Sequence, residues 1–331
     1  MKMSRKTRKL KNILLVPFEW IGIVLALAIF IPLPRRALFA ICDFLSCVMY
    51  HFDGRGKRRS LENLHIIRGT CTGDEGTVKF DPDSGPYRPT WREELIIRRS
   101  YRNMARAVGY AFWTLCRARG RCAATGEMGA SAKAFLAANK PAVTVSGHVG
   151  CWEILSQLAY LEGHEMMSVA KDIGTGGMTK LLMRARRSIG QEIVSAEGAF
   201  KPLMVGIKAG KSLGLLVDQK VDPEKGGVWI RFFGKPMPVS AAPAFFAAKA
   251  KVPIIVAWSH PLKNGRYRCE MLDVIASADA RDVWKTTQRC AKDLEKVIRR
   301  HPSCWVLNYN YFREPVTPEV IVQLEAREHV A

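Results

Sequence analysis

The sequence lacks the paired motifs of common metal and redox sites. Its nine cysteines are scattered and never spaced as C-x-x-C, and no two histidines stand at the spacing of an H-E-x-x-H helix. We therefore expect no metal or cofactor. Scattered cysteines, odd in number, suit reduced thiols facing the cytosol.

Acidic residues are few compared with basic ones. The 331 residues include 30 Asp and Glu against 51 Lys and Arg, a formal net charge of +21. Such a chain attracts polyanions, which include nucleic acid, anionic lipid and acidic carrier proteins. No zinc-finger or RNP motif accompanies the charge, so a nucleic-acid-binding or scaffolding protein is the less favoured reading.

Only one long apolar run is present, at residues 13–31, and Glu19 is its single charge. Six basic residues precede it: Lys2, Arg5, Lys6, Arg8, Lys9 and Lys11. No small-x-small cleavage site follows, which argues against a signal peptide. We predict that residues 1–54 form a basic N-terminus and membrane anchor, inserted shallowly in the cytoplasmic leaflet. A single span and a buried helix hairpin remain alternatives, since the run just reaches the roughly 20 residues that a span needs.

The rest of the chain, residues 55–331, reads as one α/β domain. Short β-like runs at 142–146, 166–170, 213–217, 228–233, 254–259 and 267–272 alternate with helical stretches at 152–161, 179–189, 202–208, 241–251 and 280–300. This alternation predicts a central mixed β-sheet flanked by helices. Residues 69–90, rich in Gly, Pro and Asp, are predicted to be a loop insertion. Residues 91–116 have helical periodicity and an arginine-rich face that is either solvated or able to meet phosphates.

A histidine follows the first of these β-like runs directly. On an ideal helix His148 and Glu153 would point about 140° apart, so the two meet only if His148 lies in the preceding loop. Gly147 and Gly150 permit a tight loop there. Acyl transfer to a hydroxyl uses such a pair, in which the carboxylate fixes the imidazole tautomer and the free ring nitrogen removes the alcohol proton. The plainer alternative is a strand-end histidine that caps the next helix.

Several ordered motifs carry a family resemblance. The segment from His148 to Glu153 matches an HxGNWE block, with Cys151 where the block has Asn. Further on, Asp218-Gln219, Gly227 and the Phe232-Phe233-Gly234 triplet match a DQ…G…FFG block. Upstream, residues 59–64 and 99–106 match R-x-L-E-N-L and R-x-x-x-N-x-x-R patterns. From about residue 55 to 312 the chain resembles the bacterial lipid A biosynthesis (lauroyl/myristoyl) acyltransferases, within the lysophospholipid-acyltransferase-like superfamily.

The resemblance implies an O-acyltransferase of the inner membrane, on its cytoplasmic face. It implies His148 and Glu153 as a catalytic dyad without a metal, acyl carrier protein as the acyl donor, and a lipid A precursor or related glycolipid as the acceptor. Membrane lipids are then partners and nucleic acid is not.

The resemblance also suggests substrate-binding residues. Lys171 stands where many members have Arg, and Arg186 begins an R-x-x-x-G match, so both are candidate phosphate contacts or else solvated cations. Asp218 and Gln219 end a buried-looking strand and are expected to position the acceptor sugar. Aromatic side chains are expected either to line an acyl groove or to be plain core: Phe232, Phe233, Phe245 and Phe246, with Gly234 beside them.

One departure concerns the acceptor. The family often closes with a basic block after an H-P…W pattern, whereas here the residues from His301 to Trp305 precede a stretch without a basic residue until Arg313. A lost basic cluster weakens the case for a heavily phosphorylated lipid. A phosphatidylinositol mannoside, an aminolipid and a lysophospholipid therefore remain alternative acceptors.

Overall fold

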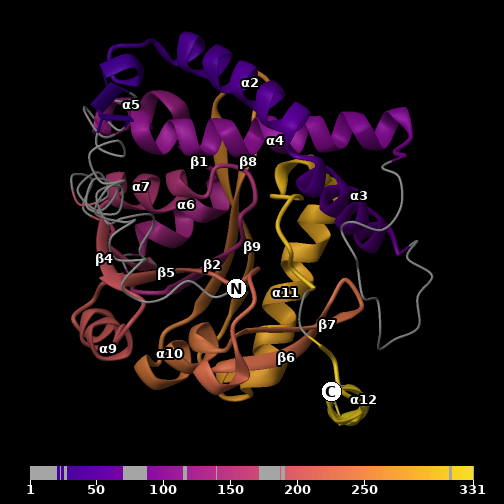
Figure 1. Cartoon of the computed structure of the whole chain (residues 1–331). Helices are drawn as coiled ribbons and strands as arrows, with labels where there is room; N and C mark the ends of the chain where they lie inside the picture. Colours follow the sequence, from indigo (N-terminus) through magenta and orange to yellow (C-terminus); the bar gives the residue numbers. More distant parts are fainter. Residues whose placement is uncertain are drawn as a thin grey trace, which may run out of the picture.

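A central mixed sheet organises the protein, which was analysed as a computed structural model describing residues 21–22, 24–25, 28–69, 88–114, 118–138, 140–170, 187, 191–312 and 315–330. Within them a seven-stranded sheet has the order β1-β9-β8-β2-β5-β3-β4 (Figure 1). Its strands are β1 (Gly126–Met128), β2 (Val143–Ser146), β3 (Met166–Ala170), β4 (Gln191–Ser195), β5 (Ser212–Leu216), β8 (Ile254–Pro261) and β9 (Tyr267–Ile275). The predicted α/β class and central mixed sheet are confirmed.

The middle of this sheet is parallel and buried. β2 lies between β5 and β8, with Val143 in register with both Leu213 and Ile254. Strands covered on both faces read as continuous apolar runs, and the segment Ile254–Trp258 is such a run. The pairing of β8 with β9 is antiparallel, which makes the sheet mixed. Because β2 and β5 run in parallel, the residues that follow them emerge at the same edge.

Helices cover both faces of the sheet. Ile254, Val256 and Trp258 of β8 face the larger core, which contains Phe246 and Leu294 from two of the covering helices. The alternate residues Ile255 and Ala257 face the other side. The helices are α2 (Arg35–Phe52), α3 (Gly54–Arg68), α4 (Trp91–Trp113), α5 (Ala118–Thr125), α6 (Ala130–Ala137), α7 (Glu153–Leu161), α9 (Phe200–Lys208), α10 (Ala242–Ala250), α11 (Val283–Arg300) and α12 (Pro318–Val330).

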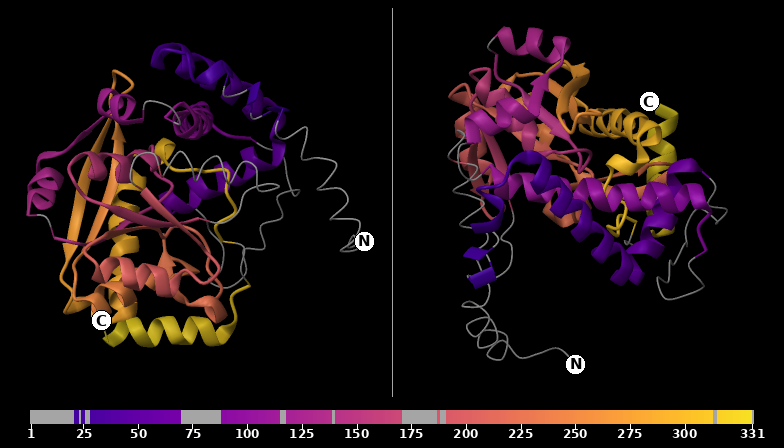
Figure 2. Two further views of the ribbon diagram at one scale, coloured as in Figure 1. Left: turned by 90° about the vertical axis from the view of Figure 1, so that its left-hand side faces the viewer. Right: turned by 90° about the horizontal axis from the view of Figure 1, so that it is seen from above.

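The N-terminal helices form a separate layer. α2 lies along α4, and Figure 2 shows it at the periphery of the molecule. Leu38 and Cys42 pack into a core with Tyr110, and Arg106 of α4 forms two 2.6 Å hydrogen bonds to the Asp43 carboxylate. The opposite side of α2 is apolar and exposed, through Phe44, Leu45, Val48, Met49 and Phe52. One face of α2 is therefore fixed to the domain and the other is left uncovered.

The predicted anchor is only partly within the described residues, because most of residues 1–31 lies outside them. Among the described residues, no single helix combines the length and the apolar character needed to cross a bilayer. α2 and α3 meet those criteria only together, and they are bent by 94° at their junction. Most of the predicted loop at 69–90 and of the predicted helix at 179–189 also lies outside the described residues.

A hairpin of β6 (Gly227–Phe232) and β7 (Lys235–Ser240) is separate from the main sheet. The β-like run at 228–233, which was expected in the central sheet, belongs to this hairpin instead. Phe233 and Gly234 form its two-residue turn with φ of 52° and 80°, the left-handed conformation of tight hairpins. This conformation explains why glycine ends the Phe-Phe-Gly triplet, since glycine adopts a positive φ without strain.

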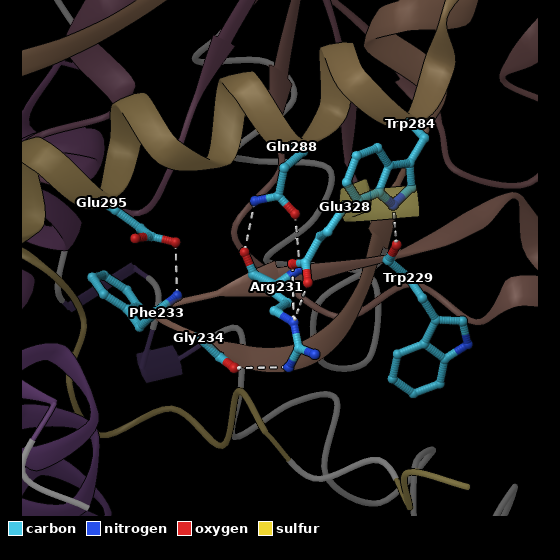
Figure 3. A network of polar contacts seen from close by, with 8 residues as sticks. All are labelled: Trp229, Arg231, Phe233, Gly234, Trp284, Gln288, Glu295 and Glu328. Carbon is cyan, nitrogen blue, oxygen red and sulfur yellow. Dashed lines mark hydrogen bonds and ion pairs between the residues drawn. The ribbon is translucent and has the colours of Figure 1, made fainter. Parts of the chain in front are cut away.

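Side chains of α11 pair with the backbone of β6 (Figure 3). Gln288 accepts from the Arg231 N–H at 2.9 Å and donates to the Arg231 carbonyl at 2.8 Å, as a neighbouring strand would. Trp284 donates to the Trp229 carbonyl, and Glu295 accepts from the Phe233 N–H. The three side chains bond Trp229 and Arg231 of β6 and Phe233 of the turn, which are alternate residues along one edge, so they cover an edge that would otherwise be open. α12 closes the arrangement through Glu328 and Arg231.

Replacing the amide that pairs with β6 should destabilise the protein. Gln288→Leu has a similar volume but leaves a buried N–H and a buried carbonyl without partners, which costs about 1–3 kcal/mol each. Urea unfolding in detergent should show a loss of about 2–6 kcal/mol for the two groups together. The matched control is Lys292→Leu on the exposed side of the same helix, with an expected change within about 0.5 kcal/mol. Equal effects of the two changes would contradict the assigned pairing.

Candidate active site

The loop after β2 presents His148 at the edge of the sheet. Two glycines permit this loop. A Cβ at Gly147 would lie 3.0 Å from the carboxylate carbon of Asp218, and Gly150 has a φ of 68° and lies directly against the Ser259 carbonyl oxygen. Any side chain at either position would push the loop away from β5 or β8. The backbone N–H of Cys151 donates to Ser259 Oγ at 2.7 Å, which fixes the end of the loop.

His148 is paired with a carboxylate from the neighbouring strand. Its Nδ1 lies 2.8 Å from Asp218 Oδ1, and its backbone N–H donates to Oδ2 at 2.7 Å. The Trp305 indole N–H also donates to Oδ2, at 2.9 Å. The Asp218 side chain is 0% exposed and the His148 side chain 21%. A carboxylate this buried needs such donors, and the three together satisfy both of its oxygens.

The two groups shift each other's titration. Burial acts to lower the pKa of His148, but the charge of Asp218, the hydrogen bond to it and the charge of Glu153 raise that pKa above its ordinary value. Burial likewise acts to raise the pKa of Asp218, but the His148 charge and the bonds from His148 and Trp305 hold it below its ordinary value. The pair therefore favours an ionised Asp218 beside an imidazole that readily accepts a proton.

The second ring nitrogen of His148 is the one that is available for chemistry. An ionised carboxylate at Nδ1 fixes the proton there and leaves Nε2 as an acceptor. The Gln219 amide nitrogen lies 3.5 Å from Nε2, at the outer limit of a hydrogen bond. The Trp152 ring packs edge-on against the imidazole, with centroids 5.0 Å apart. An oriented, partly exposed imidazole of this kind can act as a general base.

Glu153, which was predicted to orient His148, begins α7. It is close enough for its charge to raise the pKa of His148. The carboxylate hydrogen-bonded to Nδ1, however, is that of Asp218, for which the sequence suggested contact with the acceptor sugar. This difference arises from the topology, because parallel pairing of β2 with β5 brings residue 218 beside residue 148.

The other predicted residues are divided between site and core. Gln219 lies beside the base, as described. Phe232 and Phe233 are buried against the Trp305 ring, with centroids 5.8 and 5.6 Å away, and Gly234 completes the hairpin turn. Phe246 is buried, whereas Phe245 is partly exposed beside Phe200 on α9, with centroids 5.3 Å apart. Lys171 and Arg186 lie outside the described residues.

The contacts of Trp305 with Asp218 and of Ser259 with the His148 loop were not predicted from the sequence. In the sequence, Trp305 belongs to the C-terminal block that departs from the family pattern. A lone Trp after H-P is the one signal that could have indicated a buried indole in need of an acceptor. No grouping of three or more His, Cys, Asp or Glu suited to a metal occurs in the described part of the chain.

A family comparison covers the part of the chain that contains this site. The model for the bacterial lipid A biosynthesis acyltransferases matches residues 86–314, which is more than half of the chain and contains His148, Glu153, Asp218 and Trp305. The 59–64 motif precedes the matched region. No curated protein matches the chain. The resemblance inferred from the motifs is confirmed, and the protein belongs to the bacterial lipid A biosynthesis acyltransferase family.

Proposed function

We propose that the protein transfers a fatty acyl chain from acyl carrier protein to a hydroxyl of a lipid A precursor or related glycolipid, at the cytoplasmic face of the bacterial inner membrane. The observation that carries the proposal is the buried His148–Asp218 pair, which leaves Nε2 as a base at the edge of the sheet. The family supports an O-acyltransferase acting on a lipid A-like acceptor.

The chemistry follows from the orientation of the imidazole. Nε2 of His148 takes the proton of the acceptor hydroxyl as its oxygen attacks the thioester carbonyl carbon. The tetrahedral intermediate then collapses, the carbon–sulfur bond breaks, and the imidazolium returns the proton to the leaving sulfur. Asp218 keeps the proton on Nδ1 and stabilises the imidazolium, while Glu153 adds a second negative charge nearby. No covalent acyl-enzyme is needed.

A basic surface supports an acidic donor. Every exposed position of α11 carries a cation: Lys285, Arg289, Lys292, Lys296, Arg299 and Arg300. Arg289, Lys296 and Arg299 also pair with acidic side chains beside them, whereas Lys285, Lys292 and Arg300 form no ion pair with any of the described residues. The arginine face of α4 noted in the sequence is partly used internally, because Arg98 and Arg106 pair with Glu94 and Asp43. We therefore assign the docking of acyl carrier protein chiefly to the exposed face of α11.

The uncovered side of α2 supports membrane attachment. Phe44 is 67% and Phe52 80% exposed, and the two belong to an apolar face beside the basic start of α3. Apolar side chains next to cations suit the interface of an anionic leaflet. Shallow insertion of this face needs no membrane-spanning helix.

The absence of a basic residue between Trp305 and Arg313 bears on which lipid is the acceptor. A phosphatidylinositol mannoside, an aminolipid or a lysophospholipid would use the same base and the same donor chemistry. Mass spectrometry of lipids from a strain lacking the protein distinguishes them: a lipid A species short of one acyl chain supports the proposal, and a change confined to another lipid class replaces the acceptor.

Removing the base should slow transfer strongly without unfolding the protein. His148→Ala is expected to reduce kcat by about 10²- to 10⁴-fold. Asp218→Asn should cost as much, because an amide no longer holds the proton on Nδ1. Glu153→Gln, which removes a neighbouring charge, should cost less. Near-normal turnover by folded His148→Ala protein would refute the mechanism.

The raised pKa of His148 predicts the pH dependence of the wild type. Because the base must be neutral, kcat/KM should fall as the pH drops through a value above the ordinary histidine pKa of about 6.5.

Charge reversal on α11 should weaken use of the donor. Lys285→Glu with Lys292→Glu should raise KM for acyl carrier protein at low salt and leave kcat unchanged, with the difference fading as ionic strength passes about 0.1 M. Assays in detergent remove the membrane contribution. Lys201→Glu with Lys208→Glu on α9 makes the same charge change elsewhere and serves as the control. If both pairs behave alike, α11 is not the docking surface; preference for acyl-coenzyme A would exclude the donor itself.

Polar substitutions on α2 should loosen membrane binding. Phe44→Ser with Phe52→Ser should lower the partition coefficient onto anionic vesicles by more than tenfold, since burying each ring is worth about 1.5–3 kcal/mol. Phe200→Ser, at an exposed aromatic on α9, is the control and should bind like the wild type. Equal partitioning of the two proteins in a flotation assay would show that α2 does not enter the bilayer.

A further inference from the structure

Trp305 lies against the catalytic pair without being open to solvent. Its side chain follows a short 3-10 turn (Pro302–Cys304), and the residue is 1% exposed. The indole stacks on Tyr311 with centroids 4.0 Å apart and planes inclined by 19°. The rings of Phe232 and Phe233 close its remaining sides. A substrate therefore cannot touch the indole while the site has this arrangement.

The backbone around Trp305 is bonded to the loop that carries the base. Gly150 N–H donates to the Cys304 carbonyl at 2.8 Å, and Val149 and Trp305 form an isolated antiparallel bridge. On the other side, Ser100 Oγ donates to the Trp305 carbonyl at 2.5 Å. These bonds hold the indole at a fixed place relative to His148.

The one polar atom of the indole is directed at Asp218. Oδ2 of Asp218 accepts from Trp305 Nε1 and from the His148 backbone, and Oδ1 lies against His148 Nδ1. In a site with 0% exposure of the carboxylate, a neutral N–H donor takes up part of the negative charge and restricts rotation of the group.

We propose that Trp305 is a positioning residue of the reaction, whose indole N–H fixes the Asp218 carboxylate against His148 and shares its charge, so that the imidazole gives up its proton at the end of each turnover. The proposal rests on the function proposed above. The hairpin of β6 and β7 then supports Trp305, because Phe233 in its turn packs on the indole. The Phe233 N–H in turn donates to Glu295 Oε1 of α11 at 2.7 Å (Figure 3).

The other titratable groups around the pair do not compete with this effect. Glu153 of α7 faces His148, Tyr311 and Cys304 flank Trp305, and Tyr309 packs against Tyr311. Burial raises the pKa of Tyr311 well above its usual range and that of Cys304 to about 12, so both stay neutral near pH 7. Glu153 is unchanged in the variants below, so a shift in His148 titration reports on the indole N–H.

The test compares removal of the N–H with removal of packing. Trp305→Phe keeps an aromatic ring but has no donor. More negative charge then stays on Asp218, the imidazolium is held more tightly, and His148 remains protonated to a higher pH. We expect the acid limb of kcat/KM and the His148 titration, followed by NMR, both to move to higher pH. kcat should fall about tenfold to a hundredfold with KM little changed.

A second variant guards against a folding defect. Benzothienylalanine at position 305 replaces the N–H by sulfur and keeps the indole shape, and it should reproduce the shift. Tyr311→Leu removes the stacked ring but leaves the N–H in place, so it should lower the melting temperature and leave the acid limb where it is.

The outcomes separate this proposal from the proposed function. A folded Trp305 variant whose His148 titrates as in the wild type, or at lower pH, would overturn the positioning role. The NMR titration does not depend on turnover, so it decides the role of Trp305 even for a protein that transfers no acyl group. A wild type inactive with every acyl donor would instead refute the proposed function.

Discussion

The structure depends on keeping one carboxylate ionised where no water reaches it. Asp218 is fully buried and is stabilised by donors from residues 148 and 305. Each donor belongs to a segment that the fold must hold in place, because a lost bond would leave a buried charge whose cost exceeds that of most single contacts. The glycines of the His148 loop, the parallel pairing of β2 with β5 and the stacked rings around Trp305 all serve this requirement.

The support extends well beyond the residues that touch the pair. α11 contacts the central sheet on one side and, through Gln288 and Glu295, holds the hairpin whose tip packs on Trp305. The same helix presents only cations to solvent. A single amphipathic helix thus supports the sheet edge that carries His148 with its buried face and presents a charged surface with its exposed face.

Local sequence patterns predicted most of the fold. The strands at 143–146, 166–170, 212–216 and 254–261 were located to within a few residues, since buried parallel strands are short apolar runs. β1, β4 and β7 were missed. β1 has three residues, β4 contains Gln191 and Glu192, and β7 contains two prolines, so none shows an apolar or alternating pattern. His148 was expected in a loop after a strand, and the structure places it there. Its bond to Asp218 was not predicted, because a contact across 70 residues is set by strand order, which spacing along the chain does not contain.

The bridge between Val149 and Trp305 joins two segments that lie far apart in the sequence, so it forms late in synthesis. His148, Asp218 and Trp305 are separated by 70 and 87 residues along the chain. During synthesis the ribosome releases His148 and Asp218 before Trp305. The emerging chain therefore has both residues before the indole that donates to Asp218 is present. Fragments cut short before residue 305 are in the same condition. A chain that stops before residue 305 therefore has Asp218 without one of the donors that stabilise its buried charge.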